Sequence, residues 1–181
     1  VGRPAIFVRL SQCNLQCIGC DTPIRNKIEE VTIESIMSRI DNFRKVHANT
    51  RIVITGGEPL LQPEAISDIL DKVVGPYDLE TNGTIDNQID LIKRFNIVVV
   101  SPKKSCFNTI KESSSFINTW NKELNSNNNV FFKFVIGGGL KWSWSESDIK
   151  SLIEISSIDP SRIWLMPAGD NEAKLVVSGK N

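Results

Sequence analysis

Six short apolar runs alternate along this chain with segments whose apolar residues recur at helical spacing. The runs cover 5–10, 51–55, 77–81, 97–100, 130–136 and 163–166. Between them, apolar residues lie three and four positions apart, as in 33–43, 66–73 and 86–95, which is typical of amphipathic helices. Strands that alternate with helices favour a parallel sheet with right-handed crossovers. We therefore predict an α/β fold with helices on the outside of one parallel sheet, in a single domain covering 1–181.

Local signals indicate where several helices begin. Thr32 is a candidate N-cap, Pro63 suits the first turn of a helix, and Ser145 with Asp148 resembles a capping box. The segment 105–129 carries runs of Ser and Asn and no comparable signal. We expect a polar surface excursion at 113–115 and 125–129.

Composition excludes several classes of protein. Lys plus Arg equals Asp plus Glu at 21 each, so the net charge of +0 gives no support to bulk binding of nucleic acid. The apolar fraction of 40% suits a globular core, and no window approaches the roughly 18 apolar residues of a membrane helix. The single histidine excludes chemistry built on several histidines. No leader is visible and the chain does not start with Met, so we expect the gene product to extend beyond Val1.

Polar and glycine-rich segments follow the predicted strands. They cover 13–20, 55–59, 80–84, 101–103 and 166–169. In parallel α/β folds, ligands bind at the carboxyl ends of the strands. We therefore expect these five segments to form one site at that edge of the sheet.

The first of these segments is a C-x3-C-x2-C motif formed by Cys13, Cys17 and Cys20. Thiols packed this closely indicate metal ligands in a reducing cytoplasm more than a disulfide framework. One interpretation is structural zinc, with Cys106 or His47 as the fourth ligand. The other is an iron–sulfur cluster with three cysteine ligands and one open iron, which the spacing favours. In that case Cys106 is a lone thiol well outside the cluster loop.

The cysteine loop after the first strand, followed by Gly56-Gly57-Glu58-Pro59 after the second, resembles the radical S-adenosylmethionine (SAM) superfamily. The resemblance implies a partial (βα)6 barrel and a 4Fe-4S cluster. In this superfamily the amino and carboxylate groups of SAM bind the open iron, and cleavage of SAM gives a 5′-deoxyadenosyl radical.

A closer resemblance is to the 7-carboxy-7-deazaguanine synthase family. The matching segments are 2–10, Cys20-Asp21-Thr22, 54–60, 80–84, 101–103 and 165–169. The resemblance implies a magnesium-dependent lyase that converts 6-carboxy-5,6,7,8-tetrahydropterin to 7-carboxy-7-deazaguanine with loss of ammonia. The product would feed a modified base of tRNA or DNA.

The same resemblance implies a role for each matching position. Cys13, Cys17 and Cys20 would hold the cluster, Thr22 would bind Mg²⁺ together with the substrate carboxylate, and Arg9 and Thr55 would contact substrate. The implied SAM contacts are Gly19, Asp21, Gly57, Glu58, Ser101, Pro102, Lys103, Met166, Pro167, Ala168 and Gly169. Structural alternatives stay open: an ion pair for Arg9, a capping hydroxyl for Thr22, and plain turns at the strand ends. From the residues alone, Arg9 lies on a buried strand and needs a partner.

The implied partners are a pterin substrate and an electron donor such as flavodoxin or ferredoxin. A homodimer in the cytoplasm is expected, without direct contact to nucleic acid or membrane. Two other functions remain open, an activase that installs a glycyl radical on a partner protein and a zinc-stapled interaction module. The family's segments before Gly2 and after Gly169 have no counterpart here. We therefore expect the gene product to extend beyond both Val1 and Asn181, and this chain to turn over slowly. Trp142 and Trp144 suggest an exposed flap or an interface.

Overall fold

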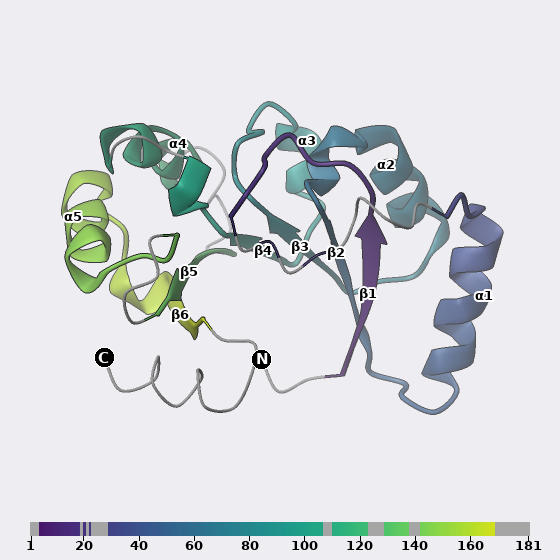
Figure 1. Ribbon diagram of the computed structural model, residues 1–181. Coiled ribbons are helices and arrows are strands. Elements are labelled where there is room, and N and C mark those ends of the chain that lie inside the picture. Colours follow the sequence, from purple (N-terminus) through teal and green to yellow (C-terminus); the bar gives the residue numbers. More distant parts are fainter. Residues whose placement is uncertain are drawn as a thin grey trace. The chain divides into compact units, whose positions relative to one another are not determined.

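The computed structural model describes residues 4–18, 20, 22, 29–106, 110–122, 129–137 and 142–168. Within these residues, six β-strands alternate with five α-helices along the chain (Figure 1), and the predicted α/β class is confirmed. None of the described helices is both long and apolar enough to cross a bilayer. The chain divides into two compact units, taken in turn below. The first comprises 1–15, 21–81 and 87–98, and the second comprises 16–20, 82–86 and 99–181.

The first unit contains β1 (Ala5–Leu10), β2 (Arg51–Gly56), β3 (Tyr77–Thr81) and the start of β4 (Ile97–Val100), in that order. β1 pairs in parallel with β2 over its whole length, and β2 pairs in parallel with β3. β2 is buried along most of its length because it has a neighbour on each side, whereas β1 is only partly buried. The side chains at the carboxyl ends of β1 and β2 are therefore held in register.

The helices of this unit begin where the sequence predicts. In α1 (Ile33–Arg44), the Thr32 hydroxyl accepts a hydrogen bond from the Ser35 amide at 3.2 Å. Helix α2 (Pro63–Lys72) has Pro63 in its first turn, after the short 3₁₀ helix η1 (Pro59–Leu61). These two N-terminal predictions are confirmed.

The third helix is much shorter than predicted. Instead of spanning 86–95, α3 is a single turn, Ile89–Ile92. Gln88 makes no side-chain cap at its start. At its end the Asn96 amide already donates to the Tyr77 carbonyl of β3 at 2.9 Å. The chain thus joins the sheet before the helix can extend.

A nearly buried ion pair lies where β2 and β3 begin. The Arg51 guanidinium donates two hydrogen bonds to the Asp78 carboxylate, one of them at 2.5 Å. The two side chains are only 16% and 13% exposed. The hydrogen bonds to Asp78 raise the pKa of Arg51 further above its usual value, so the guanidinium stays charged.

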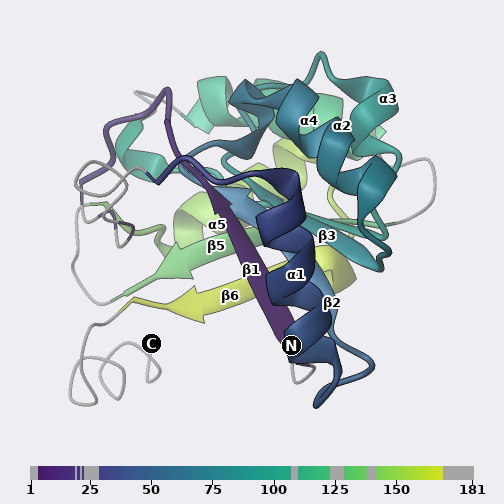
Figure 2. The same cartoon turned by 90° about the vertical axis from the view of Figure 1, so that its right-hand side faces the viewer.

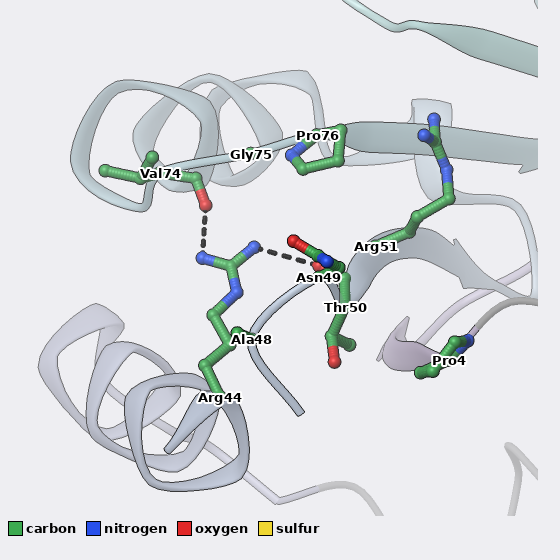
Figure 3. Close-up of a pocket in the computed structure, with 9 residues that line it drawn as sticks. All are labelled: Pro4, Arg44, Ala48, Asn49, Thr50, Arg51, Val74, Gly75 and Pro76. Carbon is green, nitrogen blue, oxygen red and sulfur yellow. Dashed lines mark hydrogen bonds between the residues drawn. The ribbon is translucent and has the colours of Figure 1, made fainter. Parts of the chain in front are cut away.

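A cavity of about 680 Å³ opens at the same amino-terminal end of the strands (Figure 3). Its lining includes Pro4 and Pro76, the residues that precede β1 and β3. Arg44 donates to the backbone carbonyls of Val74 at 2.5 Å and Thr50 at 3.2 Å (Figure 3). Within this unit, the cavity therefore lies at the opposite end of the strands from 55–59, the polar segment at the end of β2.

The second unit contains the end of β4, β5 (Val130–Ile136) and β6 (Ile163–Pro167), in that order. β5 and β6 are parallel and lie side by side (Figure 2). Phe132 is in register with Ile163. Its helices are α4 (Ile110–Lys122) and α5 (Glu146–Ser156). Two 3₁₀ helices, η2 (Lys104–Cys106) and η3 (Pro160–Arg162), complete its regular structure within the described residues.

The expected polar excursion is wrong at 113–115, whereas 125–128 lie outside the described residues. Helix α4 contains 113–115, and its buried residues are Ser113, Ser114, Ile117 and Trp120. The two serines sit on the buried side of the helix, where their small side chains allow close packing. A polar composition therefore concealed an amphipathic helix whose inner face is anchored by Ile117 and Trp120.

The predicted capping box of α5 is confirmed, and the expectation for Trp144 is wrong. The Ser145 hydroxyl accepts from the Asp148 amide at 3.2 Å, and the Asp148 carboxylate accepts from the Ser145 amide at 3.0 Å. Trp144 is 3% exposed and packs edge-on against Phe134, with 5.5 Å between ring centroids. This indole is therefore part of the core of the second unit.

Candidate functional site

The cysteine segment begins just after β1. Cys13 and Cys20 are exposed, Cys17 and Cys106 are half-buried, and all four cysteines of the chain are thiols. Cys13 belongs to the first unit, and its sulfur accepts a hydrogen bond from the Leu15 amide at 3.4 Å. Cys17 and Cys20 belong to the second unit.

The glycine pair at the end of β2 packs directly on the start of the cysteine segment. The Gly57 amide donates to the Leu10 carbonyl at 3.2 Å, and the Glu58 amide donates to the Gln12 carbonyl at 2.9 Å. A Cβ on Gly57 would lie 2.1 Å from the Gln12 oxygen and 2.6 Å from Cys13 Cβ. Only glycine therefore fits beside Cys13, and this cradle holds Gly57 against the start of the cysteine segment.

Glu58 is fully buried, and its contacts differ from its predicted role. Its Oε1 accepts from the Thr81 hydroxyl at 2.8 Å and from the Leu60 amide at 3.1 Å. These bonds join η1 to the end of β3. A contact between Glu58 and SAM stays a prediction, whereas its structural role in the first unit is evident.

Arg9 and Thr22 are in contact in the first unit. Arg9 Nη1 donates to Thr22 Oγ1 at 3.2 Å, and Arg9 is exposed rather than on a buried strand as the sequence suggested. The reason is that β1 is paired on one side only among the described strands. Thr55 is the register partner of Arg9 on β2 and is buried. The predicted magnesium ligand and the two predicted substrate contacts therefore lie in the same unit.

Two buried tryptophans of the second unit hold loops that the sequence assigned to the site. Trp120 Nε1 donates to the Gly83 carbonyl at 2.8 Å, and Trp144 Nε1 donates to the Pro102 carbonyl at 3.0 Å. Gly83 has a φ of +83°, and a Cβ there would meet Val100 Cγ1 at 2.6 Å, so this turn requires glycine. Sequence reasoning missed both tryptophans, because an indole that anchors a distant carbonyl leaves no local signal beyond its apolar character.

The loop after β4 is fixed at further points. Lys103 Nζ donates to the Ser101 hydroxyl at 2.9 Å, and Ser101 is buried. In η2, Lys104 pairs with the Asp148 carboxylate at the start of α5. Burial alone would raise the pKa of Asp148, but hydrogen bonds from Lys104 and Ser145 outweigh it and hold this pKa below its usual value.

Cys106 does not lie well outside the cysteine segment as expected. It ends η2, and its sulfur is 3.5 Å from the sulfur of Cys17. Both residues belong to the second unit, and the contact joins positions 89 apart in sequence. The anchored loop after β4 therefore carries Cys106 to the cysteine segment.

The remaining predicted residues are less fully placed. Met166 and Pro167 are exposed at the end of β6, and the buried Ala168 donates its amide to the Ile136 carbonyl at 2.6 Å. Gly19, Asp21 and Gly169 lie outside the described residues. Among the residues that the structure does describe, no group of three or more His, Cys, Asp or Glu side chains is close enough to hold a metal ion.

Comparisons with known proteins agree with these motifs. The family model of the radical SAM superfamily matches residues 8–104, more than half of the chain. A 7-carboxy-7-deazaguanine synthase of Rickettsia prowazekii (strain Madrid E) is 35% identical over 62% of this chain and 49% of its own length. Enzymes with the same name from Pyrobaculum aerophilum and Neisseria meningitidis serogroup B are 28% and 39% identical, over 94% and 62% of this chain and 73% and 50% of their own lengths.

The chain thus spans about half the length of the Rickettsia and Neisseria proteins. The matched segment contains the C-x3-C-x2-C motif, the glycine pair and the loop after β4. From this match, the chain belongs to the radical SAM superfamily.

Proposed function

We propose that this chain converts 6-carboxy-5,6,7,8-tetrahydropterin to 7-carboxy-7-deazaguanine with release of ammonia. Superfamily membership implies a 4Fe-4S cluster and SAM, which together supply a 5′-deoxyadenosyl radical when bound. The named relatives support the choice of reaction, although the chain covers only about half of two of them.

The donor set on this chain suits such a cluster. Cys13, Cys17 and Cys20 are thiols in one short segment, and the first and last are exposed. The backbone of Gly57 packs against Cys13 at a distance that any side chain at position 57 would prevent. These features support a cluster with three cysteine ligands, in a segment whose first residues pack against the glycine pair.

The observation that carries the substrate assignment is the contact between Arg9 and Thr22. A hydroxyl oxygen suits Mg²⁺, a hard cation that takes few protein ligands. A substrate carboxylate bound to Mg²⁺ at Thr22 would also meet the Arg9 guanidinium, which lies 3.2 Å from the same hydroxyl. A glycyl-radical activase has no need of this pairing, because its substrate is a protein backbone.

Other residues support binding and orientation. Thr55, in register with Arg9, is a second substrate contact, and Ser101, Pro102 and Lys103 line the SAM pocket on a loop fixed by Trp144. The segment 166–169, which begins in β6, provides a further SAM contact. We assign the chain to the cytoplasm as a homodimer that receives electrons from flavodoxin or ferredoxin.

The test is an anaerobic assay of the reconstituted chain with the pterin substrate, read by mass spectrometry of the product and titrated with Mg²⁺. Thr22→Val removes the oxygen and keeps the shape, so the magnesium requirement should rise at least about tenfold, or about 1.4 kcal/mol. Thr22→Ser keeps the oxygen and should titrate like the wild type.

Three results would contradict the proposal. An unchanged titration of Thr22→Val would remove the magnesium role. A glycyl radical formed on a partner protein, without pterin turnover, would favour an activase. A colourless protein that binds zinc and no iron would favour an interaction module.

A further inference from the structure

We propose that Cys106 is the redox partner of Cys17, and that the two form a disulfide in the cluster-free chain. Formation of the disulfide depends only on these two thiols and not on the proposed function. Its consequence for cluster loading rests on the proposed function, because it assumes that Cys17 is a cluster ligand.

The distance between the two sulfurs supports this pairing. They lie 3.5 Å apart, and a disulfide bond of about 2.05 Å needs them to approach by only about 1.5 Å. Two thiolates on one tetrahedral metal ion, each about 2.3 Å from it, would be separated by about 3.8 Å. Such an ion needs further ligands, and the described residues offer no group of three around it. The distance by itself fits either arrangement, and it is the lack of a third ligand among the described residues that favours a thiol pair over a mononuclear metal site.

The turn that carries Cys106 is anchored at two points. The Cys106 amide donates to the Lys103 carbonyl at 2.9 Å, which closes η2. Lys104, at the start of η2, is paired with Asp148 at the start of α5. Cys106 is therefore held in place, and Cys17 needs only a local adjustment in the cysteine segment to reach it.

The oxidation is balanced by a low-molecular-weight disulfide such as oxidised glutathione. One protein thiolate attacks this disulfide, which forms a mixed disulfide and releases one reduced thiolate. The second protein thiolate then attacks the protein sulfur of the mixed disulfide and releases a second one. The protein loses two electrons and two protons, and two molecules of reduced thiol are formed.

The consequence concerns the ligand set of the cluster. Only a thiolate binds iron, so a disulfide at Cys17 leaves two of the three proposed ligands. A dithiol reductant would restore the third. The pair would thus make cluster loading depend on the thiol redox state of the surroundings.

The competing product is a disulfide between Cys17 and Cys20, which are separated by two residues in sequence. The experiment treats the reduced, cluster-free chain with oxidised glutathione, alkylates the remaining thiols and maps disulfides by mass spectrometry. We expect a peptide pair joined through Cys17 and Cys106, with the reactive thiols falling from four to two. A Cys17–Cys20 linkage as the main product, or glutathione adducts alone, would overturn the proposal.

Two variants serve as matched controls. Cys20→Ser removes the competitor and should keep the Cys17–Cys106 linkage. Cys106→Ser removes the proposed partner of Cys17, and its reduced form should take up as much iron as the wild type. Loss of iron from reduced Cys106→Ser would instead make Cys106 a ligand and overturn the proposal.

Iron uptake separates this inference from the proposed function. The oxidised wild type should take up no cluster, and treatment with a dithiol should restore uptake to the level of the reduced chain. If the reduced chain takes up no iron while the Cys17–Cys106 linkage forms, the proposed function fails and the dithiol pair stands. If the reduced chain loads normally but the linkage never forms, the inference alone fails.

Discussion

Replacing Gly57 with alanine should disturb the cysteine segment more than the rest of the chain. The added Cβ would lie 2.1 Å from the Gln12 carbonyl oxygen, and carbon atoms in proteins essentially never approach within 3.0 Å in this way. The backbone at Gln12 must therefore retreat by about 0.9 Å. That shift strains the hydrogen bond from the Glu58 amide to the Gln12 carbonyl and moves Cys13, whose Cβ is the next nearest atom.

The cost follows from these two effects. Overpacking against a rigid neighbour typically costs about 1–3 kcal/mol, and the loss of one backbone hydrogen bond adds about 0.5–1.5 kcal/mol. We therefore expect Gly57→Ala to lower the free energy of unfolding by about 2–4 kcal/mol. With a urea m-value near 2 kcal/mol/M, the midpoint should fall by about 1–2 M.

The assay combines urea unfolding of the cluster-free chain with iron analysis after anaerobic reconstitution. Gly75→Ala is the matched control, because its Cβ would meet the Tyr77 ring at 2.5 Å at the amino-terminal end of the strands, away from Cys13. The control should lose stability and still take up iron, whereas Gly57→Ala should lose both. Wild-type unfolding and iron content in Gly57→Ala would refute the reasoning.

Three further predictions concern buried polar groups. Thr81→Val removes a hydrogen-bond donor from the fully buried Glu58 carboxylate, so the free energy of unfolding in urea should fall by about 1.5–3 kcal/mol. Thr81→Ser keeps the hydroxyl and should retain most of this free energy. Asp78→Ala leaves the Arg51 guanidinium without its carboxylate partner and should lower the free energy of unfolding by about 3–5 kcal/mol. The double variant Arg51→Met with Asp78→Leu should lower it by less, and equal losses would show that the charge is not buried. Because the folded pKa of Asp148 is lowered, its contribution is present above its ordinary pKa and is lost as the pH falls through the folded value. Below about pH 5, the free energy of unfolding should therefore change less with pH in Asp148→Asn than in the wild type. Parallel curves of this free energy against pH for the two proteins would contradict the prediction.

The sequence alone determined the α/β class, most strand positions and several helix starts. These features depend on residues close in sequence: apolar periodicity, the hydroxyl of Thr32, and the reciprocal bonds of Ser145 and Asp148. It also identified the three-cysteine motif and the glycine pair, because their spacing is itself the signal. The same local view misjudged 113–115, since a helix that buries serines looks polar in composition.

Only the tertiary structure decided which distant groups meet. Glu58 is satisfied by Thr81 at the end of another strand, and the indole of Trp144 anchors the loop after β4 from the start of α5. Cys106 lies beside Cys17 although 89 positions separate them, because β4 and η2 return the chain to that place. Such contacts depend on how strands and helices pack. No periodicity or motif spacing in the sequence indicates them, because the residues that meet lie far apart along the chain.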